Sequence, residues 1–286
     1  MSLRPVVKVN RSKPLLEGAG VKVHRAFGFR DVERLDPFLM FDDFHSEEPK
    51  DYMAGFPLHP HRGIETVTYM IKGQVEHRDN IGNQGVIGSG DVQWMTAGSG
   101  IMHEEMPRRT EGMMQGFQLW VNLPRAHKMM PPRYREVTRE DIPVIEPRIG
   151  VEVKVIAGKV EGVQGPVKDL VVKVRYLDVE LAPEQQWELD VPQGHSSFAY
   201  VFQGKGSFDN SGEQFGQDHL VMFGEGDSLM VKSRQNGVRF LLVSGEPLKE
   251  PVAWGGPIVM NTEEELEQAF SELRSGDFIK GAPIQT

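Results

Sequence analysis

The sequence predicts an all-β protein made of two tandem barrel modules, with one short α-helix near the C-terminus. Short apolar runs rich in β-branched and aromatic residues are separated by turn residues along the whole chain, a pattern typical of β-sandwiches and barrels. The 31 glycines and 19 prolines are spread over the 286 residues. Two further observations support this prediction. The two halves have similar sequence patterns, which indicates two modules, and a single stretch has helical periodicity, which indicates one helix.

The expected strands fall into two sets separated by a proline-rich and charged stretch. The first set comprises residues 21–27, 38–44, 65–71, 91–96 and 116–123. The second set comprises residues 151–158, 174–181, 197–204, 219–226, 227–233 and 238–245. Residues 124–150 lie between the two sets and are the best candidate for a linker between the halves.

A single stretch, residues 262–274, carries the marks of a helix. Thr262 is the expected N-cap, and Glu265 three residues later completes a capping box. Gly276 can close the C-terminal end of the helix. The expected apolar face consists of Leu266, Ala269, Phe270 and Leu273. Because such a face needs cover, packing against the body of the protein is the expected role, with protein docking as the alternative.

Two short patterns recur in the same order in both halves. Tyr69–Gly73 is similar to Tyr200–Gly204, and Gly88–Val92 is similar to Gly224–Ser228. Strand–glycine–strand patterns also recur by chance in β proteins, so the repeat is a hypothesis. It predicts two domains, residues 1–135 and residues 136–286, with the helix in the second.

The first half contains two pairs of metal-ligand residues at a spacing of two. Residues two apart on a β-strand point to the same face, so His59 can act with His61, and His103 can act with Glu105. Glu104 would point to the opposite face. Three imidazoles and one carboxylate suit Fe(II), Mn(II), Ni(II), Cu(II) or Zn(II).

The second half lacks the same ligand set. Carried over by the spacing of the repeat, the first pair falls on Asp190 and Pro192, and the second pair falls on Arg239 and Leu241. The sequence therefore predicts one metal site, in the N-terminal domain.

These motifs resemble the cupin superfamily, whose fold is a double-stranded β-helix or jelly-roll barrel, and within it the pirin family. The family marks are HPHRGIET at 59–66 and GDVQWMTAGSGIMHEEMP at 90–107. Residues 36–44 and 254–266 are pirin-like too, so the resemblance covers essentially the whole chain. The family commonly has Asp before the first histidine, where this chain has Leu58.

The resemblance implies a role for each residue of the site. His59, His61, His103 and Glu105 are the expected ligands, and Fe(II) is the expected metal. Common cupins take the carboxylate from the position of Glu65, whereas the pirin pattern moves it to Glu105. Arg62 and Glu65 could orient the imidazoles, with a salt bridge at the strand ends as the equal alternative.

The resemblance also implies two functions of different kinds. The first is a flavonol (quercetin) 2,3-dioxygenase that opens the heterocyclic ring of its aromatic substrate with O2. In that reaction Glu105 would accept the proton of the substrate hydroxyl. The second is an iron-dependent, redox-sensitive regulatory protein that binds transcription factors or metabolic enzymes without catalysis.

Composition narrows the expected partners and location. The formal net charge is −9, which disfavours direct binding to nucleic acid or to anionic membranes. The chain has no cysteine, so disulfides and thiolate ligands are excluded. Without a signal-peptide core or a long apolar run, a cytoplasmic protein is expected, or a nuclear one in a eukaryote. Without a heptad stretch, a monomer is expected.

Overall fold

The chain folds into two compact units, each built on an antiparallel β-barrel. The computed structural model describes residues 2–280. The N-terminal barrel unit consists of Lys13–Val32, Phe38–Arg139 and the chain from Leu248 onward. The C-terminal barrel unit consists of the chain up to Ser12, Glu33–Pro37 and Glu140–Pro247. The expectation of an all-β protein with two tandem barrels is confirmed.

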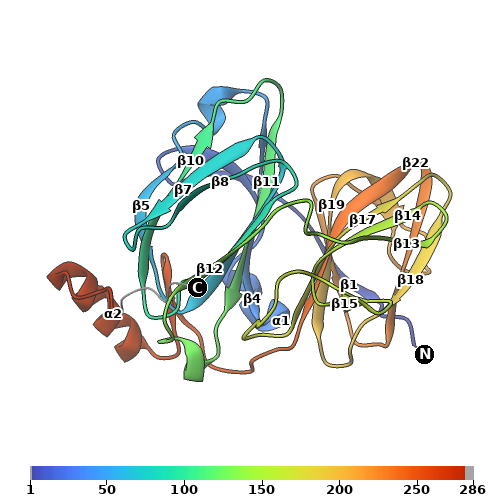
Figure 1. The fold of residues 1–286 in the computed structure, drawn as a ribbon. Coiled ribbons are helices and arrows are strands. Elements are labelled where there is room, and N and C mark those ends of the chain that lie inside the picture. The colour runs from blue at the N-terminus through green and yellow to red at the C-terminus, as the bar shows by residue number, and fades with distance from the viewer. Residues whose placement is uncertain (1, 281–286) are drawn as a thin grey trace. The chain divides into compact units, whose positions relative to one another are not determined.

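Two sheets form the N-terminal barrel unit and face each other in Figure 1. The larger sheet runs in the order β12 (Arg133–Val137), β9 (Val92–Thr96), β6 (Ile64–Lys72), β11 (Met114–Asn122), β4 (Phe38–Ser46), β3 (Val21–Phe27), β2 (Lys13–Glu17). The smaller sheet runs in the order β5 (Phe56–His61), β10 (Ile101–Arg108), β7 (Gln74–Asp79), β8 (Gln84–Ile87).

One large sheet dominates the C-terminal barrel unit. Its main path is β1 (Val6–Arg11), β21 (His219–Phe223), β19 (Ser196–Ser207), β22 (Ser228–Gly245), β17 (Val174–Leu181), β14 (Val151–Ala157), β13 (Val144–Arg148). Two strands lie off this path, β18 (Gln186–Asp190) on β22 and β20 (Phe215–Gly216) on β19. A short pair, β15 (Lys159–Val160) and β16 (Val163–Gln164), completes the unit.

The remaining elements are short, apart from the C-terminal helix. They are η1 (Phe29–Asp31), α1 (Val32–Leu35), η2 (Pro49–Asp51), η3 (Arg125–His127), β23 (Ala253–Gly255), β24 (Ile258–Met260) and α2 (Glu263–Ser275). No helix within residues 2–280 has the length and apolar character needed to span a membrane.

Two details of the chain differ from the sequence-based expectation. The runs at 227–233 and 238–245 are the two ends of one long strand, β22, whose first part pairs with β18 and whose second part pairs with β17. The expected linker at 124–150 contains two strands, because β12 joins one unit and β13 joins the other. The chain passes between the units after Arg139.

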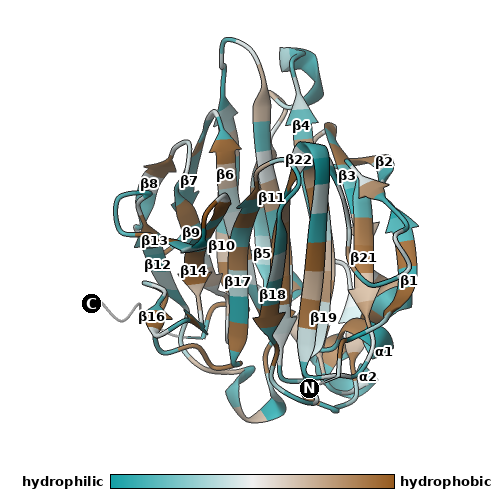
Figure 2. Ribbon diagram, turned by 90° about the vertical axis from the view of Figure 1, so that its right-hand side faces the viewer, coloured by the Kyte–Doolittle hydropathy of each residue, from teal (hydrophilic) through white to brown (hydrophobic). Residues whose placement is uncertain are grey.

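The interiors of the two barrels differ in chemistry. Strands of both barrels carry long apolar stretches, shown in brown in Figure 2. The C-terminal barrel has a continuous apolar core, in which Val155, Leu177, Val201 and Phe240 are fully buried. Among the described residues, this apolar core contains no group of possible metal ligands. The N-terminal barrel instead buries polar side chains inside its sheets, including Thr68 and His103.

The C-terminal helix forms where the sequence predicts it. The Thr262 hydroxyl accepts from the Glu265 backbone, the Glu265 side chain accepts from the Thr262 backbone, and Gly276 closes the helix with a φ of 85°. Leu266 and Ala269 are buried against β23 and β24. This packing confirms the expected role for the apolar face, and it groups α2 with the N-terminal barrel unit.

Candidate metal centre and its pocket

The two ligand pairs meet because β5 and β10 are neighbouring antiparallel strands. His59 lies directly opposite His103 in this ladder, and His61 lies opposite Ile101. Directly opposed residues point to the same face of a sheet, so all three histidines project into the barrel. The register shifts between His103 and Glu105, which lies opposite Phe56. A bulge of this kind re-aims a side chain next to a site.

The three imidazoles form a compact group. One nitrogen from each of His59, His61 and His103 lies within 4.8 Å of the other two. The ring centroids of His59 and His103 are 4.4 Å apart, and those of His61 and His103 are 5.1 Å apart. The Glu105 carboxylate lies outside this group of described residues, although it lines the same cavity. It accepts a hydrogen bond from Thr68 Oγ1 at 3.1 Å.

Two backbone carbonyls determine which nitrogens of His59 and His61 face the cavity. His59 Nδ1 is 2.9 Å from the Pro57 oxygen, and His61 Nδ1 is 3.2 Å from the Pro257 oxygen. A carbonyl oxygen only accepts, so both Nδ1 atoms must carry the proton. The two Nε2 atoms then point their lone pairs at each other across 3.1 Å. A shared cation relieves this repulsion.

His103 supplies a second indication that this site suits a cation. Its side chain is 0% exposed, and within the described chain neither ring nitrogen has a hydrogen-bond partner. A buried polar atom without a partner costs free energy, so native structures rarely leave one. The chemistry of this donor set therefore fits a divalent transition metal.

Burial keeps all three rings in the form that binds a metal. It lowers the pKa of His61 to about 3, aided by the neighbouring His59. Burial also lowers the pKa of His59, and it holds that of His103 well below its usual range. The imidazoles are therefore neutral at physiological pH. Burial raises the pKa of Glu105 to about 7, although the bond from Thr68 opposes the rise.

The Arg62 side chain is bonded to groups other than the imidazoles. Its buried guanidinium donates to the Ser99 oxygen at 2.8 Å, the Phe278 oxygen at 2.6 Å and Glu272 Oε2 at 2.7 Å. The guanidinium also lies 4.2 Å from the centre of the Phe278 ring. Arg62 thus ties the chain beside His61 to the C-terminal segment.

Glu65 is fully buried and is likewise bonded away from the imidazoles. Its carboxylate accepts from Trp94 Nε1 at 3.0 Å and from Thr96 Oγ1 at 2.6 Å. Arg135 lies 4.0 Å away. These contacts join β6, β9 and β12. Leu58 is 57% exposed, so its side chain lies outside the cavity.

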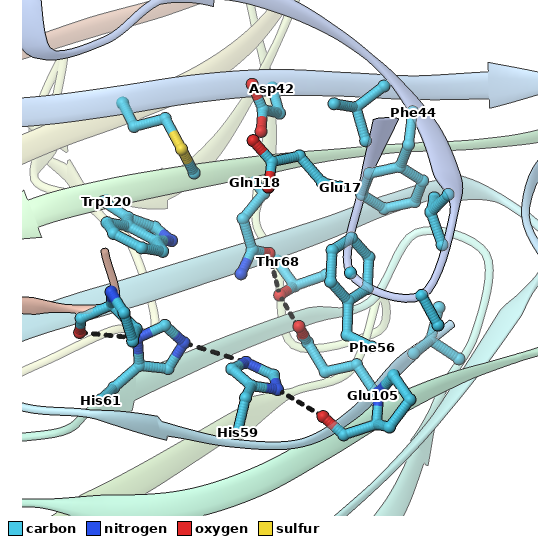
Figure 3. Close-up of a pocket in the computed structure, with 18 of the residues that line it drawn as sticks. Glu17, Asp42, Phe44, Phe56, His59, His61, Thr68, Glu105, Gln118 and Trp120 are labelled. Atoms are coloured by element: carbon cyan, nitrogen blue, oxygen red, sulfur yellow. Dashed lines mark hydrogen bonds between the residues drawn. The ribbon is translucent and has the colours of Figure 1, made fainter. Parts of the chain in front are cut away.

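A cavity of about 590 Å³ opens in front of the histidines. Figure 3 shows His59, His61 and Glu105 at one end, with Trp120 and Phe56 beside them. Trp254 and Pro257 of the C-terminal segment also line it. A mostly apolar cavity with a few convergent polar groups is typical of a small-molecule site.

Several residues of this cavity were not expected from the sequence. Thr68, Gln118 and Asp42 are inward-facing polar residues within apolar strands, and all three line the cavity. The available signal was the break that each makes in its apolar run. The carbonyls of Pro57 and Pro257 carry no side-chain signal, since any residue has a carbonyl oxygen.

Comparison with known proteins identifies the family of this chain. The family model described as Pirin matches residues 20–121, and the Pirin C-terminal cupin domain matches residues 176–279. A pirin-like protein of Caulobacter vibrioides is 44% identical over 281 residues, covering 97% of this chain and 100% of that protein. Pirin of Homo sapiens is 41% identical over 268 residues, covering 92% and 90% of the two chains.

A solved structure extends the likeness to three dimensions. The crystal structure of a quercetin 2,3-dioxygenase from Acinetobacter baumannii has a TM-score of 0.90 and 32% sequence identity to this chain. The match covers 98% of this chain and 100% of that one. With both family models and these long alignments in agreement, the chain belongs to the pirin family.

Proposed function

We propose that this protein is a metal-dependent dioxygenase that opens the heterocyclic ring of a flavonol such as quercetin. The observation that carries the proposal is the facing pair of Nε2 atoms on His59 and His61, 3.1 Å apart with both Nδ1 atoms bonded to carbonyls. That arrangement calls for a cation. The solved quercetin 2,3-dioxygenase at 32% identity supports the choice of reaction.

The proposed ligands are His59, His61, His103 and Glu105. Three neutral imidazoles and one carboxylate would hold a divalent ion, and a bound metal would supply Lewis acidity toward the substrate hydroxyl. Glu105 lies outside the imidazole group and faces the cavity. Its side chain would therefore have to turn toward the ion to become the fourth ligand. Fe(II) is the proposed metal.

Glu105 also has the properties of a general base. Its pKa of about 7 lies close to physiological pH, and such matching favours proton transfer. Thr68 Oγ1 is bonded to it at 3.1 Å and so orients the carboxylate. We propose that Glu105 takes the proton that the flavonol hydroxyl loses on binding.

The cavity walls suit a flat aromatic substrate. Trp120 stands edge-on to His61 with a ring-centre separation of 5.0 Å, and it packs against Trp254 at 6.0 Å. Phe56 lies on the other side, 6.4 Å from His59. Aromatic rings placed this way bind a planar ligand by stacking and edge contacts, and they exclude water from the reacting end.

The test combines metal analysis with turnover. Purified protein reconstituted with Fe(II) should consume quercetin under oxygen, seen as loss of its absorbance with release of carbon monoxide. His103→Ala should lose metal and turnover together, whereas His127→Ala, at an exposed histidine, should keep both. Bound metal without turnover across a flavonol panel would contradict the enzyme and favour the non-catalytic regulator. Full turnover in His103→Ala would contradict the site.

A further inference from the structure

The cavity has a second polar end, away from the histidines. Glu17 of β2, Arg25 of β3 and Asp42 of β4 meet there, and we call these three residues the carboxylate end. Arg25 Nε donates to Asp42 Oδ1 at 2.8 Å, and Nη2 donates to Asp42 Oδ2 at 2.7 Å. The same Nη2 lies 2.9 Å from Glu17 Oε1. Two carboxylates share one guanidinium, so this end is net negative.

A row of paired residues connects the two polar ends of the cavity. Thr68 lies directly opposite Gln118, which lies opposite Asp42, which lies opposite Arg25. Opposed residues share a face, and neighbouring strands are spaced by about 4.8 Å, so the row spans roughly 14 Å. Thr68 is bonded to Glu105 at 3.1 Å. The row therefore leads from the metal centre to the carboxylate end.

The carboxylate end has unused capacity to accept hydrogen bonds. Arg25 contacts Glu17 through Oε1, which leaves Oε2 for a further donor, and the Glu17 side chain is 38% exposed. Each Asp42 oxygen accepts one bond from Arg25 and has a second lone pair. Midway along the row, Thr68 Oγ1 lies 2.6 Å from Gln118 Oε1 and 3.1 Å from Glu105 Oε1, so its single proton is shared between the two acceptors. The amide nitrogen of Gln118 faces the cavity in Figure 3.

We infer that the carboxylate end is a specificity subsite, which receives a hydroxyl group on the ring of the substrate that lies farthest from the metal. Glu17 is the principal acceptor and Asp42 the secondary one. The inference rests on the proposed function, because the metal centre must hold the other end of the ligand. A phenolic hydroxyl donates to a carboxylate in a charge-assisted bond, which is about twice as strong as a neutral one.

The same charges exclude an anionic substituent. Glu17, Asp42 and Glu105 line the cavity, and Arg25 is the guanidinium among its lining residues. A sulfonate or carboxylate placed beside Glu17 would meet like charge in a partly buried site, where screening by water is weak. The pocket is therefore suited to neutral polyphenols and unsuited to their sulfonated derivatives.

Binding measurements without oxygen test the inference apart from turnover. Metal-loaded protein is titrated calorimetrically with 3-hydroxyflavone, with analogues hydroxylated on the pendant or the fused ring, and with a quercetin sulfonated on the pendant ring. In the wild type, a remote hydroxyl should tighten binding roughly tenfold. The sulfonate should weaken it by a similar factor. Two affinity ratios summarise these effects: that of the hydroxylated analogue over 3-hydroxyflavone, and that of quercetin over its sulfonate. Glu17→Gln should reduce both affinity ratios severalfold. Glu47→Gln, a change of equal charge at an exposed position, should leave both ratios unaltered.

Each result decides the inference separately from the dioxygenase. Equal ratios in the wild type and in a folded Glu17→Gln variant would overturn the subsite, as would a failure of metal-loaded protein to bind any member of the series. Hydroxyl-dependent binding without turnover would support the subsite and contradict the dioxygenase. Turnover combined with affinity ratios that are unchanged in Glu17→Gln would support the dioxygenase and contradict the subsite. Thermal unfolding verifies that Glu17→Gln is folded.

Discussion

At the scale of single residues, the candidate metal centre is organised by groups other than its proposed ligands. The carbonyls of Pro57 and Pro257 orient His59 and His61 by accepting from their Nδ1 atoms. These bonds leave the Nε2 lone pair of both rings available, so the tautomer that can bind a metal is already present without one. Thr68 orients the Glu105 carboxylate in the same way, through the hydrogen bond between them.

Thr68 provides a prediction at this scale. Burial raises the pKa of Glu105 to about 7, and the bond from the Thr68 hydroxyl lowers it. Thr68→Val removes that donor from a charged acceptor, so the pKa should rise by roughly one unit. NMR titration of carbon-13-labelled glutamate in the metal-free protein measures the shift. Thr68→Ser keeps the hydroxyl and should titrate like the wild type; an unshifted Glu105 in Thr68→Val would refute the assignment.

At the scale of elements, the C-terminal segment completes the N-terminal barrel. Lys128 donates to the carbonyls of Gly63 and Val259 at 2.9 and 3.0 Å, which holds β24 against the turn at Gly63 between β5 and β6. A Cβ on Gly63 would come within 1.9 Å of the Val259 oxygen, so this close approach requires glycine. Arg62 and Glu272 anchor α2 on the same side. Residues from both ends of the unit thereby shape one cavity.

The anchor of α2 should be sensitive to acid. Burial alone raises the pKa of Glu272, but bonds from Gln268, Arg62 and Lys280 outweigh it and lower the pKa to about 2, against 4.5 for a free glutamate. The resulting stabilisation is therefore complete above about pH 4.5, and it is lost as the pH falls toward 2.

The matching variant is Glu272→Gln, which leaves the buried Arg62 without its counter-charge. It should lower the free energy of unfolding by about 2 kcal/mol at neutral pH. The difference from wild type should shrink as the pH falls below about 4.5, as measured by denaturant unfolding followed by circular dichroism. Glu267→Gln, an exposed change on the same helix, serves as the control. A difference that stays constant down to pH 2 would rule out the anchor as the source.

At the scale of the whole molecule, two barrels of one fold have different interiors. The C-terminal barrel fills its interior with aliphatic and aromatic side chains. The N-terminal barrel keeps a cavity of about 590 Å³ with histidines at one end. Apolar burial stabilises a barrel by itself, whereas buried polar groups need partners. The proposed ion would therefore contribute to the stability of the N-terminal barrel unit and not to that of the C-terminal one.

Metal removal tests this difference between the units. An ion that binds only the folded state stabilises it by about 4 kcal/mol when its free concentration is a thousand times its Kd. A chelator should therefore lower the thermal transition of the N-terminal barrel by several degrees, in calorimetry that resolves the two units. The transition of the C-terminal barrel should not move. In His103→Ala the chelator should have no effect, and an equal shift in both transitions would contradict a single site.

Much of this architecture could be predicted from local patterns. Alternating apolar runs identify the strands, and Thr262 with Glu265 places the start of α2, because capping depends on neighbours in sequence. The spacing of two within His59–His61 and within His103–Glu105 predicts that each pair shares a face, since side-chain direction alternates along a strand. The like patterns at Gly73 and Gly204 predict two modules, and both glycines adopt positive φ, 93° and 68°.

Only the tertiary structure decides how those pieces meet. The register that sets His59 opposite His103, the carbonyl of Pro257 at His61 and the row from Thr68 to Arg25 all join segments far apart in the chain. Sequence periodicity tells which face a residue occupies, but pairing between distant strands depends on the combined packing of every strand in the sheet. The candidate metal ligands could thus be proposed from local spacing, whereas the cavity beside them exists only in the folded barrel.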